Sequence, residues 1–117
     1  MKNRILEEQQ KICKQYSAQF TSSDMESIIG ISDNTNGINV LLNGLRHQPK
    51  DNNSGWYIWS GKELSQNEDF FKPLHVKHLV KKCPQVLKFL ALPPGYRFLI
   101  DNEGYADVWY DPKLLKV

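Results

Sequence analysis

The sequence predicts a single-domain α+β protein, in which an N-terminal helix and a pair of short helices pack on an antiparallel or mixed β-sheet. The length of 117 residues favours one domain, which we place at residues 1–117. Hydrophobic residues make up 40% and charged residues 24%, as in globular proteins. The hydrophobic period changes along the chain in the order helix, β segments, two short helices, β-hairpin, and this order favours such a sheet.

The first predicted element is an amphipathic helix from about Asn3 to Phe20, within an N-terminal part that ends near residue 22. One stripe recurs at spacings of three and four residues, namely Ile5, Gln9, Ile12, Tyr16 and Phe20. The run Thr21–Asp24 then supplies residues typical of caps and turns. We expect the sheet and the other helices over residues 25–111.

A β region follows the first helix. Ser27–Ile31 is apolar and rich in β-branched residues, and Asn34–Gly37 ends in Asn-Gly, a strong signal for a tight hairpin. Ile38–Leu42 is then predicted as the return strand, and the second Asn-Gly, at Asn43 and Gly44, predicts another reversal. Trp56–Trp59 is the clearest strand, and its bulky side chains require cover on both faces.

The second half is predicted to hold two short helices and a hairpin. Asp69 can cap a helix that begins near Pro73, and Pro84 interrupts it and starts a second one ending near Leu90. The last two strands are Tyr96–Ile100 and Ala106–Tyr110. We assign structural roles to residues at turns, at a helix start and in strands: Gly55, Trp56, Pro84, Gly95 and Trp109.

No group of residues predicts catalysis. His75 and His78 are spaced for one helical face, but the local sequence offers no third metal ligand. Cys13 and Cys83 are expected to be reduced, buried thiols, although a single disulfide between them remains an alternative. The sequence contains no nucleophile elbow, P-loop or dinucleotide-binding glycine pattern. We therefore expect no enzyme activity, no catalytic or metal-ligating residues and no cofactor.

Charge is distributed unevenly, although the net charge is only +2. No acidic residue lies between Phe70 and Ile100, so the predicted helix 73–83 carries an unneutralised basic face. A net charge this small does not predict nucleic-acid binding, and no segment has the length of a membrane span. Because residues 1–10 lack the apolar core of a signal peptide, we expect a cytoplasmic protein.

From about Ile38 to Asp111 the chain resembles a family of bacterial immunity proteins, the thirty-third in the polymorphic-toxin immunity series. The matching features are Asn53–Gly61, Leu74–Leu79, Cys83–Leu90 and Leu92–Phe98. The resemblance implies a non-enzymatic protein that neutralises a toxin encoded beside it. It carries over no catalytic residue and no toxin contact.

We therefore predict an immunity protein that binds a cognate toxin protein, with no nucleic-acid or membrane partner. The alternatives are a general protein-binding or regulatory module and, from another class, a small metal-dependent or thiol enzyme. The predicted partner-binding residues combine the basic helix face with two strand aromatics expected to be exposed: Tyr57, Trp59, His75, Lys77, His78, Lys81 and Lys82.

Overall fold

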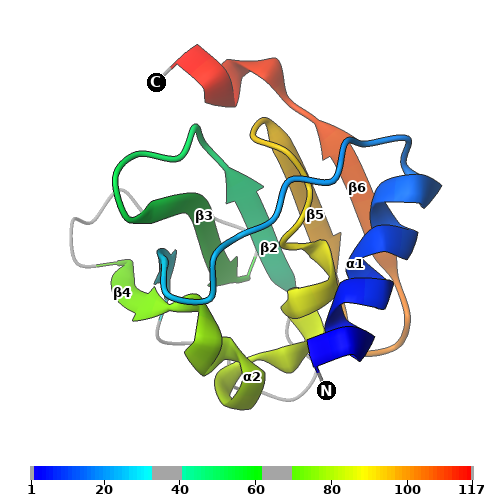
Figure 1. The fold of residues 1–117 in the computed structure, drawn as a ribbon, viewed down its shortest axis with the longest axis horizontal. Helices are drawn as coiled ribbons and strands as arrows, with labels where there is room; N and C mark the ends of the chain where they lie inside the picture. The colour runs from blue at the N-terminus through cyan, green and yellow to red at the C-terminus, as the bar shows by residue number, and fades with distance from the viewer. Residues whose placement is uncertain (1, 33–40, 62–69, 117) are drawn as a thin grey trace.

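The computed structural model describes residues 2–32, 41–61 and 70–116, and it confirms the α+β class (Figure 1). Six strands form one sheet: β1 Ile28–Ile31, β2 Leu42–Arg46, β3 Asn53–Ser60, β4 Lys72–His75, β5 Tyr96–Ile100 and β6 Ala106–Tyr110. The α-helices are α1 Lys2–Gln15 and α2 Leu79–Lys82, and the 3-10 helices are η1 Val76–His78, η2 Pro84–Phe89 and η3 Pro112–Lys116.

The strand order is β4-β1-β3-β2-β5-β6, with β1 and β3 parallel and the other neighbours antiparallel. The sheet is therefore mixed, which is one of the two arrangements predicted. The strand β3 lies inside it between β1 and β2, which explains why Trp56–Trp59 is bulky on both faces.

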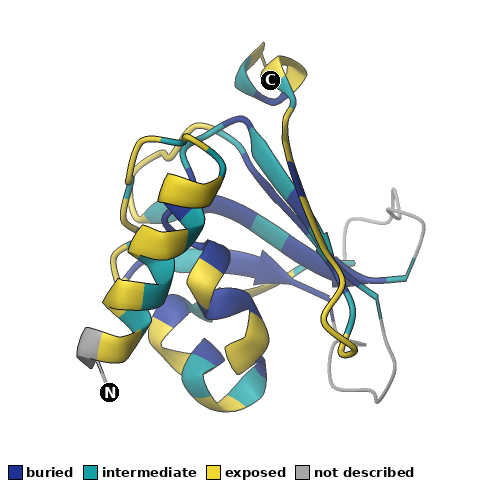
Figure 2. Cartoon of the chain, turned by 90° about the vertical axis from the view of Figure 1, so that its right-hand side faces the viewer, coloured by how far each residue is buried: buried dark blue, intermediate teal, exposed yellow. Residues whose placement is uncertain are grey.

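Helices cover one face of the sheet (Figure 2). On that face Trp56 and Ile58 of β3 pack with Leu79 and Phe89 of the helices in the main core, where all four are fully buried. The opposite face carries a smaller cluster built on Leu45, Trp59 and Leu114. Alternation along β3 thus sends neighbouring aromatic residues into two separate clusters.

The first helix is shorter than predicted, because it ends at Gln15 rather than near Phe20. Ser17 has a positive φ of 54°, a left-handed conformation that cannot continue an α-helix. Residues 16–27, here called the strap, then run across the molecule to β1 (Figure 1). The strap is attached where the Thr21 N–H donates to the Ala91 carbonyl at 2.7 Å.

The structure differs from both predictions that were based on Asn-Gly pairs. The predicted turn 34–37 lies outside the described residues, but β1 pairs with β3 and β4 and not with β2, so the predicted hairpin is wrong. Asn43 and Gly44 lie within β2, so the second reversal is also wrong. A side chain on Gly44 would collide with the Phe98 ring, which indicates that this glycine is needed for packing rather than for a turn.

The predicted helix start at Pro73 is wrong as well. Pro73 lies in β4, an edge strand, where a residue without a backbone N–H is tolerated. Helical structure begins at Val76, and the predicted cap Asp69 lies outside the described residues. By contrast, the structure confirms the break at Pro84, the hairpin of β5 and β6, and two buried free thiols at Cys13 and Cys83.

Candidate functional site

The basic residues are presented by η1 and α2, which are fixed to the core by their apolar side. Val76, Leu79 and Cys83 are buried, as the predicted apolar face requires. Helical spacing therefore turns Lys77, His78 and Lys81 outward, where they are exposed. Lys82 and His75 are partly buried at the two ends of this segment.

One of these charges has an acidic partner that the local sequence did not reveal. The ammonium of Lys77 lies 3.2 Å from both carboxylate oxygens of Glu26, at the end of the strap. Both side chains are substantially exposed, so this ion pair contributes at most about 1 kcal/mol. The expectation of a wholly unneutralised face is therefore wrong for Lys77, while the described residues supply no ion pair for Lys81 or Lys82.

Two adjoining cavities lie between α1 and the segment from η1 to η2, and both are lined by Ile5 and Val80. The larger has a volume of about 620 Å³, and its other lining residues are Met25, Lys77, His78, Lys81 and Lys82. The smaller has a volume of about 320 Å³, and its other lining residues are Glu8, Pro84, Gln85, Leu87 and Lys88. Together these residues form the basic groove, which has an apolar floor and a mostly basic rim.

The two predicted strand aromatics do not join this groove. Tyr57 and Trp59 lie on the opposite face of the sheet, in the cluster built on Leu45 and Leu114. Trp59 is only 2% exposed, so its predicted exposure is wrong, and the half-buried Tyr57 is flanked by His47 and Phe71 at ring distances of 5.6 and 5.2 Å. Of the seven predicted partner-binding residues, four therefore line the basic groove, His75 lies outside its lining but against the ring of His78, and the two strand aromatics lie on the other face of the sheet.

The described histidine and cysteine side chains form neither a cluster of metal ligands nor an activated thiol. The rings of His75 and His78 meet edge to face with centroids 5.8 Å apart. Within residues 2–32, 41–61 and 70–116, no group of three metal-binding side chains gathers. Burial raises the pKa of the Cys83 thiol to about 11, opposed by the nearby Lys82, and burial also raises that of Cys13. Both thiols therefore stay protonated at neutral pH, which lowers their reactivity.

This state of the thiols predicts slow chemical labelling. We expect a thiol-specific disulfide reagent at pH 8 to modify Cys13 and Cys83 at least about tenfold more slowly in the folded protein than in denaturant, because both must be exposed before a thiolate forms. The measurement is the rate of modification with and without denaturant, with a cysteine-free peptide mixture as the reagent blank. Labelling at the denatured rate would show that the thiols are accessible in the native protein.

The positions assigned structural roles are placed as follows. Trp56 is fully buried, and its Nε1–H lies 3.1 Å from both the Ser23 hydroxyl and the Leu90 carbonyl. Gly55 and Gly95 have positive φ values of 91° and 95°, and Pro84 begins η2. Trp109 differs from these, because 36% of it is exposed and its ring faces the guanidinium of Arg97.

Sequence reasoning missed Arg46, which is 2% exposed. Its guanidinium donates to main-chain carbonyls from three segments, those of Ser54, Thr21 and Leu92, at 2.7–2.9 Å, with a longer bond to Ser22. Burial lowers the pKa of Arg46 to about 10, so the side chain remains charged at neutral pH. The signal that misled was the preceding Asn-Gly, which predicted a chain reversal just before Arg46 and gave no indication that this side chain is buried.

Comparison with family models agrees with the resemblance. The model of the Imm33-like domain matches residues 8–111. The chain belongs to this family. The match begins well before the residue 38 from which the resemblance was recognised, and it therefore takes in the second half of α1 as well as the whole sheet.

Further comparisons added no relative. Searches among curated proteins and among solved structures gave no match. The helices in the described part of this Imm33-like chain are all too short or too polar to cross a bilayer.

Proposed function

We propose that this Imm33-like protein is an immunity protein, which binds and neutralises a cognate bacterial toxin in the cytoplasm without catalysis of its own. The observation that carries the proposal is the basic groove on a domain of this family. A groove with an apolar floor and charged rim is suited to hold side chains of another protein, because apolar contacts supply affinity and charge complementarity supplies orientation and speed of association.

The electrostatics of the groove indicate an acidic toxin surface. Lys77, Lys81 and Lys82 all line the larger cavity of the groove, and of these only Lys77 has an ion-pair partner within the described residues. Because the Lys77–Glu26 pair is exposed and weak, an incoming carboxylate can replace it with little loss of free energy. The apolar floor at Ile5 and Val80 lies within reach of a partner side chain that enters between the lysines.

The first test is neutralisation. The chain is expressed together with the toxin encoded beside its gene, and growth and complex formation are measured. Rescue of growth with a stable complex is expected. Failure of the unmodified chain to bind or neutralise that toxin would overturn the proposal and favour a protein-binding module outside toxin systems.

Charge reversal tests the surface. We expect the variant Lys77→Glu, Lys81→Glu, Lys82→Glu to fold normally, because all three side chains reach solvent, and to associate with the toxin about tenfold or more slowly at low salt. The difference should shrink at moderate salt, since exposed charges are screened beyond a Debye length of about 8 Å. Stopped-flow association at two ionic strengths measures both effects.

A matched control separates the groove from net charge alone. Lys14, Lys50 and Lys72 are exposed lysines outside the groove, and reversing them changes the net charge by the same amount. The control should associate nearly at the unmodified rate. Equal slowing of both variants would show that overall charge, and not this groove, guides the toxin.

A further inference from the structure

The two edges of the sheet differ in how they are protected. The edge strand β4 carries Lys72 and Pro73, two residue types that discourage pairing with another strand. The edge strand β6 at the other end contains neither lysine nor proline. Figure 2 looks onto the β6 side of the sheet, and all residues of β6 except the central Val108 are exposed.

The β5–β6 ladder shows which backbone groups of β6 point away from the sheet. The Asp101 N–H donates to the Tyr105 carbonyl, and the Asp111 N–H donates to the Gly95 carbonyl. Antiparallel pairs alternate between bonded and non-bonded, so the residues between these two ends alternate in the same way. The N–H and C=O groups of Ala106, Val108 and Tyr110 therefore point outward, toward the free edge.

Exposed aromatic side chains gather at this same strand. Tyr105 is 51% exposed, Trp109 36% and Tyr110 50%, and they are three of the five large hydrophobic residues that are exposed in the described part of the chain. Trp109 and Tyr110 point to opposite faces of the sheet, because successive strand residues alternate. A strand added at this edge would be contacted by an aromatic ring from each face.

We propose that the β6 edge pairs with the β6 edge of a second copy of this chain, which joins two sheets into one across a two-fold axis at Val108. In this antiparallel register Ala106 faces Tyr110 of the second copy, and Asp107 faces its Trp109. Shifting the register by two residues in one direction places Asp107 opposite Asp107, and shifting it in the other places Asp107 opposite Asp111. Of these three registers, only the one centred on Val108 joins the outward groups without opposing two carboxylates, which are unfavourable as direct neighbours.

The charges beyond the strand favour the same partner. Antiparallel pairing brings the hairpin turn of one copy, which carries Asp101 and Glu103, toward the C-terminal segment of the other, which carries Lys113 and Lys116. A second copy thus pairs the outward backbone groups of β6 and places the small Ala106 opposite the large Tyr110. It also brings opposite charges together at both ends of the paired strands. This inference concerns self-association and does not depend on the proposed toxin binding.

The test is the oligomeric state of the full chain by sedimentation equilibrium over a wide concentration range. A reversible dimer is expected to form. Trp109→Glu should raise its dissociation constant at least about tenfold, because it places a carboxylate opposite Asp107 of the second copy at two symmetric positions. Within one chain the new carboxylate faces Arg97, which already lies beside this side chain, so the fold should be retained.

A charge exchange makes the test specific. Adding Asp107→Lys to Trp109→Glu puts opposite charges across the axis and should return the dissociation constant to within about threefold of the original. Lys72→Glu at the β4 edge is the control and should leave the dimer unchanged. Circular dichroism confirms that each variant is folded.

Three results would overturn the inference. A single-chain mass up to about 1 mM would show that self-pairing is too weak to matter. A dimer that Trp109→Glu does not weaken, or that the double variant does not restore, would place the interface elsewhere. A monomeric chain whose toxin binding is lost on Trp109→Glu would show that the toxin, and not a second copy, takes this edge.

Discussion

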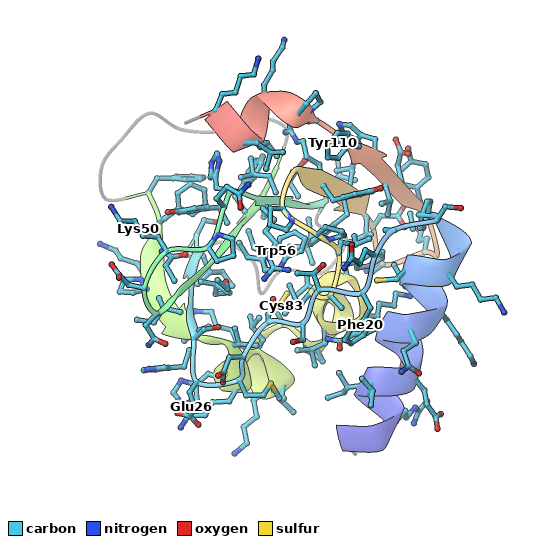
Figure 3. All side chains as sticks on the ribbon, turned by 45° about the horizontal axis from the view of Figure 1, so that its top comes forward. Phe20, Glu26, Lys50, Trp56, Cys83 and Tyr110 are labelled. Atoms are coloured by element: carbon cyan, nitrogen blue, oxygen red, sulfur yellow. The ribbon has the colours of Figure 1, made fainter. Side chains whose placement is uncertain are left out.

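Replacing Trp56 with alanine is expected to lower the free energy of unfolding by about 3–5 kcal/mol, a large share of a typical 5–15 kcal/mol. Trp56 lies in the interior of the molecule, where it is fully buried (Figure 3). Its ring contacts the Phe98 ring at a centroid distance of 5.6 Å. Its removal leaves a cavity that the surrounding strands cannot close, because β3 is held on both sides by neighbouring strands.

Polar contacts add to this effect. The Trp56 Nε1–H lies 3.1 Å from both the Ser23 hydroxyl and the Leu90 carbonyl, so the indole joins the strap to the end of η2. Trp56→Phe keeps most of the volume but loses the donor and part of the ring, and we expect it to cost about 1–3 kcal/mol. Denaturant unfolding of both variants measures the difference. Equal midpoints for Trp56→Ala and the unmodified protein would show that Trp56 does not support the fold.

Elements with strong local signals could be predicted from the sequence. The bulky run Trp56–Trp59, the break at Pro84 and the alternation of the last two strands each identify a structure from neighbouring residues alone. The Asn-Gly pair at Asn43 and Gly44 misled because its physical role is long-range. Gly44 accommodates the Phe98 ring from β5, and nothing near it in the sequence reports that contact.

In the candidate site too, features set by neighbouring residues could be predicted from the sequence, and features set by long-range contacts could not. Helical spacing predicted that Lys77, His78 and Lys81 would share an outward face, and they do. The residues that complete or neutralise the groove, Ile5 and Glu26, come from α1 and the strap, so only the tertiary structure could place them there. Trp59 was expected to be exposed as an anchor for the partner, but a second cluster on the far face of the sheet encloses it.

Arg46→Met is expected to destabilise the protein by about 4 kcal/mol or more. The guanidinium of Arg46 bonds carbonyls of β3, of the strap and of the segment after η2, and it lies over the Trp56 ring at 5.7 Å. Methionine preserves much of the side-chain length but cannot donate, and the carbonyls cannot be removed with it because they belong to the main chain. The buried carbonyls of Ser54 and Leu92 therefore lose this donor, which carries a desolvation penalty.

The strap is the segment in which Arg46→Met should change hydrogen exchange most. Because Arg46 bonds the carbonyls of Thr21 and Ser22, its loss should accelerate amide hydrogen exchange in residues 16–27 more than in β5 or β6. Arg46→Lys should be intermediate, since an ammonium cannot reproduce the geometry of a planar guanidinium. Arg97→Met is the matched control: Arg97 meets Asp111 at 3.4 Å near the surface, and its loss should cost only about 1 kcal/mol. If Arg46→Met and Arg97→Met have the same unfolding midpoint and exchange pattern, the buried guanidinium does not hold the strap to the sheet.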